Sequence, residues 1–184
     1  WFKTLPLFYE GNTFKAVHAC WDYDNIKYLK KTLVNDRLTD ELIYQSVKKG
    51  TRLNEAIDQT LKGKEITMPD GLYFTDKDGT KRNEIRIKWW EDSSKMTYKS
   101  ISVLPIEKLP EKPIQSSDLK SLDFYHPDDK SVFFGHYWQK GEPSFCKDNA
   151  CCLDYSVARP GGKLVAYRWD GEQQLDAGKF VAVE

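Results

Sequence analysis

Two histidines occupy equivalent positions in the sequence, each directly after a short apolar run. His18 follows residues 14–17, Phe-Lys-Ala-Val, and His136 follows residues 132–135, Val-Phe-Phe-Gly. Such runs predict strands, and ligand sites in open sheets gather at the carboxyl ends of strands. Neutral imidazole is a common ligand of transition metals. A metal or catalytic role is one interpretation. Two partly buried, hydrogen-bonded histidines are the other, and the pattern alone favours it.

The remaining histidine and the cysteines offer weaker alternatives. His126 lies in a polar segment, where we expect it to be solvated. We expect Cys146, Cys151 and Cys152 to be reduced thiols, because a disulfide framework is uncommon in a chain of this size without a secretion signal. A zinc site is the alternative, but the C-x4-C-C pattern fits poorly to the paired C-x2-4-C spacing of structural zinc sites. Cys20 stands two positions after His18 and could act as a nucleophile on the same strand face, although a small buried thiol is the commoner case.

Strand and helix patterns place these residues. We expect a strand over residues 13–19 that ends at His18. Capping residues and apolar spacing then predict three helices: from Asp24 to about Leu33, from after Thr39 to about Lys48, and from Thr51 to a stop at Gly63.

The rest of the chain has the pattern of short strands. We expect a hairpin that pairs residues 72–74 with residues 84–90 across a turn at residues 76–79. Residues 105–118 contain three prolines and predict an extended connector. Further strands are expected over residues 131–134, 150–157, 163–169 and 180–183.

Several segments resemble a bacterial branch of the calcineurin-like metallophosphoesterases, and they follow one another in the same order as the motifs of that branch. This branch is related to protein serine/threonine phosphatases and symmetrical diadenosine tetraphosphatases. Residues 17–22, Val-His-Ala-Cys-Trp-Asp, are similar to its strand-end His-Ala segment, and residues 133–138, Phe-Phe-Gly-His-Tyr-Trp, to its closing Gly-His motif. Residues 84–90 and the stretch 152–169 look like the same branch. The likeness covers nearly the whole chain.

The resemblance implies a hydrolase that uses two divalent metal ions, Mn, Fe or Zn, to bind a phosphoester and activate water. His18 and His136 would be ligands of the same metal ion. Asp154 would support the metal-binding residues without binding the metal ion itself, although a turn-stabilising role is equally compatible. Arg86 would bind substrate phosphate, or else pair with Glu84 or Glu91. The substrate would be a phosphorylated small molecule, a nucleotide or a phosphoprotein.

The chain departs from the family pattern in two ways. Trp138 stands where many members have a further metal-binding histidine. The family's early motifs, Asp-x-His, Gly-Asp-x-x-Asp and Gly-Asn-His-Asp/Glu, do not occur in the sequence. We therefore expect this chain to be a C-terminal portion that is inactive alone, with the N-terminal half of the same protein as its partner.

The resemblance also implies a fold class and a domain organisation. We expect an α/β (α+β) fold, the C-terminal part of the metallophosphoesterase β-sandwich with flanking helices. Residues 1–23 and 119–184 would belong to this domain. Residues 24–118 would form an inserted cap of helices and a hairpin with a Pro-rich connector, where substrate choice is made.

Composition limits the other function classes. The chain has 184 residues, and 28 basic residues balance 28 acidic ones, so net charge gives no argument for nucleic acid. No apolar run approaches the roughly 20 residues that span a membrane, so we expect no membrane partner and a cytoplasmic protein. The alternative to an enzyme is a binding or scaffold module that keeps half of the phosphoesterase fold.

Overall fold

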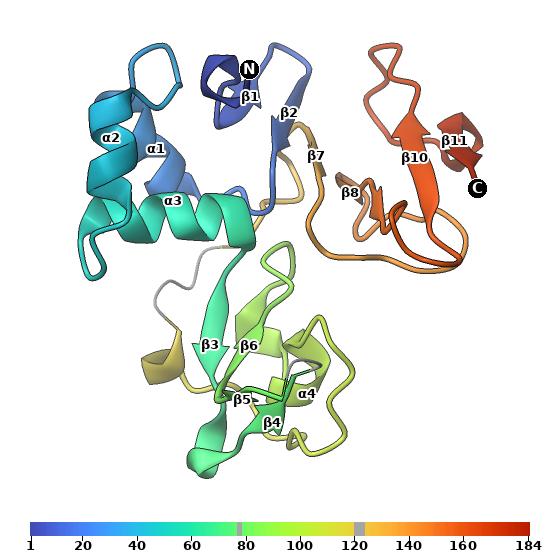
Figure 1. The fold of residues 1–184 in the computed structure, drawn as a ribbon. Coiled ribbons are helices and arrows are strands. Elements are labelled where there is room, and N and C mark those ends of the chain that lie inside the picture. Colours follow the sequence, from blue (N-terminus) through green and yellow to red (C-terminus); the bar gives the residue numbers. More distant parts are fainter. Residues whose placement is uncertain (77–78, 120–123) are drawn as a thin grey trace.

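The chain forms a four-stranded sheet in the order β1-β2-β7-β8 (Figure 1). His18 and His136 follow the carboxyl ends of β2 and β7. The computed structural model describes residues 1–76, 79–119 and 124–184. β1 is antiparallel to β2, whereas β2, β7 and β8 are mutually parallel neighbours. Their bounds are β1 Phe8–Glu10, β2 Phe14–Val17, β7 Ser131–Phe134 and β8 Ala150–Cys152. The predicted strands that precede His18 and His136 are therefore confirmed.

Three helices follow β2 and lie on one side of this sheet (Figure 1). They are α1 Tyr23–Thr32, α2 Asp40–Ser46 and α3 Arg52–Lys62. Thr39 and Thr51 cap α2 and α3 as predicted, and Gly63 ends α3. The predicted cap of α1 was wrong: Asp22, not Asp24, accepts the backbone N–H of Asn25 at 2.7 Å. Among the described residues, no helix has both the length and the apolar content that a membrane span requires.

The segment after α3 forms two small ladders and a short helix, α4. The expected hairpin was wrong in its pairing: residues 65–67 pair with residues 84–86, and residues 74–75 with residues 81–82. Ile66 and Ile85 face each other across the first ladder and are buried, so burial of this pair sets the register. The expected turn includes residues 77 and 78, which lie outside the described residues. The bounds are β3 Glu65–Thr67, β4 Phe74–Thr75, β5 Lys81–Arg82, β6 Glu84–Arg86 and α4 Tyr98–Ile101.

The C-terminal part adds a three-stranded antiparallel sheet in the order β11-β10-β9. The single strand expected over residues 150–157 is interrupted at Leu153. The backbone N–H of Leu153 makes a last bond of the β7–β8 ladder, to the Phe134 carbonyl, and the chain then enters a second sheet. Its first half extends the histidine-bearing sheet and its second half pairs with β10. The bounds are β9 Asp154–Tyr155, β10 Lys163–Tyr167 and β11 Phe180–Val183. The structure is thus mixed α/β with small sheets.

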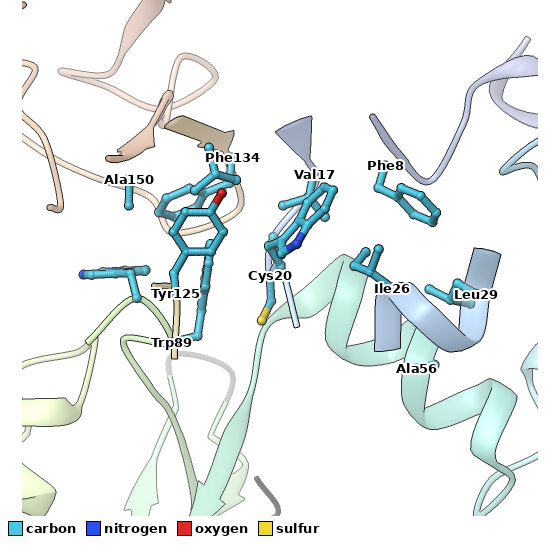
Figure 2. Packing of buried hydrophobic residues seen from close by; sticks show 14 of the residues in the cluster. Phe8, Val17, Cys20, Ile26, Leu29, Ala56, Trp89, Tyr125, Phe134 and Ala150 are labelled. Carbon is cyan, nitrogen blue, oxygen red and sulfur yellow. The ribbon is translucent and has the colours of Figure 1, made fainter. Parts of the chain in front are cut away.

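Two separate apolar clusters fill the interior. The larger one joins the four-stranded sheet to α1 and α3, with Val17 between Phe8 and Ile26 on the helix side and Tyr125 and Phe134 on the other (Figure 2). The smaller cluster contains Ile66, Ile85 and Ile101 and lies within residues 66–119. The helices therefore share a core with the sheet, and residues 66–119 have a core of their own.

Lys15 of β2 is a buried charge beside aromatic residues of the larger cluster. Its ammonium lies 2.5 Å from the Asp129 carboxylate and 3.6 Å from that of Glu10. It also lies over the rings of Trp21 and Tyr125, at 4.8 and 5.6 Å from their centroids. A buried ammonium is tolerated only when charges and hydrogen bonds compensate its desolvation, and here two carboxylates and aromatic faces do so.

We expect Lys15→Met to lower the free energy of unfolding by roughly 3 kcal/mol, because Asp129 would lose its buried counter-ion. Burial raises the pKa of Asp129, but hydrogen bonds from Lys15 and Tyr23 outweigh it and hold this pKa below its ordinary value. A depressed carboxyl pKa stabilises the fold above the unfolded value of about 4, and this contribution is lost as pH falls through the folded value.

Urea unfolding at pH 7 and pH 3 would measure both effects. Lys31→Met, an exposed change on α1, is the control and should leave stability within about 0.5 kcal/mol. The variant Lys15→Met should lose less stability between the two pH values than the wild type. A variant as stable as the Lys31 control would contradict this account of Lys15.

Candidate metal site

His18 lies directly beyond the end of β2 and is exposed. Its backbone carbonyl accepts the N–H of Gly135 at 2.9 Å, which continues the parallel β2–β7 ladder by one more bond. The next two residues are held by α3, because the carbonyl of Thr60 accepts the N–H groups of Ala19 and Cys20 at 3.0 and 3.3 Å. His18 thus projects from a backbone that is fixed on both sides.

A buried ion pair secures the same turn from the other end. The ammonium of Lys64 lies 2.6 Å from the Asp22 carboxylate, and the side chains of Lys64 and Asp22 are only 10% and 4% exposed. The other carboxylate oxygen of Asp22 caps α1. One side chain therefore links the turn after His18 to the start of α1 and to the residue that follows Gly63.

His136 lies beside His18, with the two ring centroids 5.3 Å apart. It is half-buried, and burial lowers its pKa, followed by the charges of Arg86 and His18. A lowered pKa favours the neutral imidazole, which is the form that binds metal ions. The structure therefore brings together the two histidines that the sequence singled out.

The backbone around His136 adopts uncommon conformations. His136 has φ of 72° and Trp138 has φ of 50°. Residues other than glycine rarely adopt positive φ, and each such residue costs about 1–3 kcal/mol. Strain of this kind clusters at functional sites. Gly135 itself is not forced by space, since an added Cβ would meet Asp154 and the His18 carbonyl at 3.5 and 3.6 Å, ordinary contact distances.

Asp154 holds this strained loop in place. Its Oδ2 accepts the N–H of Trp138 at 3.3 Å, and its Oδ1 accepts the N–H of Ser156 at 3.0 Å. Its backbone carbonyl accepts the N–H of Gln139 at 2.8 Å. The turn-stabilising role that the sequence left open is therefore observed, in a residue that also lines the cavity beside the histidines.

An open cavity of about 450 Å³ lies at the histidine pair. Its walls are mostly apolar and come from the ends of β2 and β7 and from Leu153. A second cavity of about 620 Å³ adjoins it and shares Ala16, Val17 and His18. The lining residues of the first are Ala16, Val17, His18, Phe133, Phe134, Gly135, His136, Leu153 and Asp154.

Arg86 of β6 lies close enough to His136 for its charge to lower the histidine pKa. Its guanidinium is 5.9 Å from the ring centroid of Tyr137 and 3.5 Å from the carboxylate of Glu65. Glu65, and not Glu84 or Glu91, is thus its acidic neighbour. The buried Nε of Arg86 has no hydrogen-bond partner among the described residues. Arg86 accordingly supplies positive charge beside the histidines.

Tyr137 and Gly63 position Arg86, a role that the sequence analysis missed. Tyr137 is 5% exposed, and a Cβ added at Gly63 would lie 2.4 Å from its hydroxyl and 3.2 Å from Cδ of Arg86. Lys62, which precedes Gly63, also lowers the pKa of His136. Only the Gly63 helix stop was visible in the sequence, because the contact depends on two segments that meet in the folded chain.

The cysteines and His126 do not join this site. Burial raises the pKa of Cys20 to about 12, which leaves very little thiolate and argues against a nucleophilic role. Burial likewise raises the pKa of Cys146, to about 11, and that of Cys152, to about 12. His126 is exposed, as predicted.

Imidazole nitrogens of His18 and His136 are suitable donors for a transition metal, but two ligands do not complete a site. Within the described part of the chain, no group of three or more His, Cys, Asp or Glu residues is arranged to hold a metal ion. Asp154 is engaged by backbone N–H groups. The described residues therefore fit part of a metal site and would need further ligands.

Comparisons with protein-family models, with curated proteins and with solved structures found no match to this chain.

We expect Gly63→Ala to destabilise the fold by roughly 2–4 kcal/mol, because the new Cβ would displace Tyr137 and Arg86. Gly63 also has φ of 93° and ψ of 168°, a region that is essentially restricted to glycine. Thermal unfolding would measure the effect. Gly50→Ala is the matched control, since Gly50 has φ of 78° but no atom within 4 Å of an added Cβ, and it should cost about 1 kcal/mol. Equal losses in both variants would contradict the close packing at Gly63.

Proposed function

We propose that this chain contributes to a metal-dependent phosphoester hydrolase, with His18 and His136 as ligands of one metal ion. The observation that carries the proposal is the adjacency of the two rings, 5.3 Å apart at the carboxyl ends of neighbouring parallel strands. Such strand ends are the usual place for ligand sites in α/β folds. The segment resemblance that singled out both histidines points to the same chemistry.

The bound metal ions, Mn, Fe or Zn, would supply Lewis acidity toward the phosphate and lower the pKa of a bound water. The role of this chain would be to hold two neutral imidazoles at a fixed separation. The remaining ligands, carboxylates above all, would come from the N-terminal half of the same protein. Asp154 would keep the His136 loop in its strained conformation and so fix the ring.

Arg86 would bind the substrate phosphate. Its charge already acts on His136, and Lys62 adds a second positive charge nearby. Guanidinium binds phosphate through two parallel hydrogen bonds, which orients the anion as well as attracting it. Contacts with Tyr137 and Glu65 would hold the side chain toward the site. Phosphomonoesters, nucleotides and phosphoproteins all present the anion that this arrangement suits.

We expect His18→Ala and His136→Ala in the full-length protein to lower kcat/KM for p-nitrophenyl phosphate with Mn²⁺ by more than about 100-fold. Loss of outer partners of metal ligands already costs 10–100-fold, and loss of a ligand should cost more. Metal content would be measured on the same samples. His126→Ala is the control, since that histidine is exposed and outside the site.

The isolated 184-residue chain should show no Mn²⁺-dependent turnover, because its described residues offer too few ligands. Turnover by this chain alone that His18→Ala abolishes would refute the need for outside ligands. Wild-type metal content and activity in His18→Ala of the full-length protein would refute the metal role itself and favour a binding or scaffold module.

We expect Arg86→Ala to weaken inhibition of the full-length enzyme by inorganic phosphate about 10–100-fold, the range for one charge-assisted hydrogen-bonding group. Arg86→Lys should recover part of the lost phosphate inhibition, because lysine keeps the positive charge but cannot make two parallel hydrogen bonds to the phosphate. Arg82→Ala, an exposed arginine on β5, is the control. Unchanged phosphate inhibition in Arg86→Ala would remove Arg86 from the proposed site.

A further inference from the structure

Trp138 is a large aromatic side chain that the fold leaves exposed beside the histidine pair. The residue is 44% exposed, and its ring centroid lies 6.2 Å from that of His136. The backbone at Trp138 has φ of 50°, an uncommon conformation for a bulky residue. Neither burial of the ring nor backbone preference therefore accounts for its position, and the surrounding contacts must impose it.

Arg159 lies against the same ring from the loop between β9 and β10. Its guanidinium is 4.6 Å from the Trp138 centroid, within the range of a cation–π contact. The loop is tight: the N–H of Arg159 bonds to the Ser156 carbonyl at 2.8 Å, and an added Cβ at Gly162 would fall 1.9 Å from that carbonyl oxygen. Among the described residues, Arg159 forms no ion pair, so its charge is not neutralised by a neighbouring carboxylate.

A single carboxylate fixes both partners of this contact. Asp154 accepts the backbone N–H of Trp138 with one oxygen and that of Ser156, at the base of the Arg159 loop, with the other. Asp154 also lines the cavity at His18 and His136. The tryptophan, the arginine and the histidine pair are thus held relative to one another by one side chain.

An exposed aromatic side chain next to the proposed phosphate site suits one class of ligand. Nucleobases stack on tryptophan and on guanidinium planes, and each such stack typically strengthens binding about 5- to 150-fold. An aliphatic phosphate or a phosphoserine side chain has no flat surface to use this face.

We propose that Trp138, backed by Arg159, stacks on the nucleobase of a nucleotide substrate whose phosphate lies at the histidine pair. This inference rests on the proposed phosphoesterase function and selects nucleotides from its three substrate classes. Trp138 would determine specificity and would not bind the phosphate.

The test is calorimetric binding of three probes to the full-length, Mn²⁺-loaded protein: adenosine monophosphate, ribose 5-phosphate and inorganic phosphate. We expect adenosine monophosphate to bind about tenfold more tightly than ribose 5-phosphate. Trp138→Ala should abolish this preference and leave the affinity for inorganic phosphate unchanged. Trp138→Phe should keep most of it, and Arg159→Ala should reduce it.

Tyr44→Ala is the control, because Tyr44 is an aromatic residue 77% exposed on α2, outside the site. Equal affinity of the wild-type protein for adenosine monophosphate and ribose 5-phosphate would overturn the stacking role. A preference for adenosine monophosphate that survives in Trp138→Ala would overturn it as well. Binding of adenosine monophosphate that depends on Trp138, without any binding of inorganic phosphate, would instead support the base site and count against the phosphate site. Circular dichroism of each variant would show that the fold is retained.

Discussion

The parallel pairing of β2 with β7 is the constraint on which the candidate site depends. Parallel strands end at the same edge of a sheet, so the residues that follow each strand become neighbours however far apart they are in sequence. The register that sets Ala16 opposite Phe133 carries His18 and His136 to that edge together. A shift of one residue would turn the buried Val17 outward, and the apolar cluster therefore fixes the register.

Polar anchors then convert adjacency into a defined geometry. The Lys64–Asp22 ion pair and the Thr60 carbonyl hold the turn after His18, and Asp154 holds the loop after His136. Each anchor joins segments that are distant in the sequence. The Lys64–Asp22 pair is buried, and an ion pair shielded from water tolerates less displacement than an exposed one, where solvent competes.

Charge and packing around the histidines act in the same direction. Burial together with the charges of Arg86 and His18 lowers the pKa of His136, and a neutral imidazole is the form that binds a metal ion. The same positive charges would attract a phosphate. Gly63 lacks a side chain, so the Tyr137 hydroxyl and Arg86 can pack closely against its backbone. The glycine that ends α3 therefore also permits the packing beside His136.

The sequence alone determined the local structure well. Capping threonines, Gly63 and the apolar runs predicted α2, α3, β2 and β7, because these signals act between residues a few positions apart. It missed what depends on distant partners: the ladder of residues 65–67 with 84–86, the break at Leu153 and the contacts of Arg86 with Tyr137 and Glu65. Strand pairing and burial depend on contacts between segments that are distant in the sequence. The local pattern of residue types does not show which of these segments come into contact. Sequence therefore identified His18 and His136 as candidates, and only the tertiary structure decided that they lie side by side.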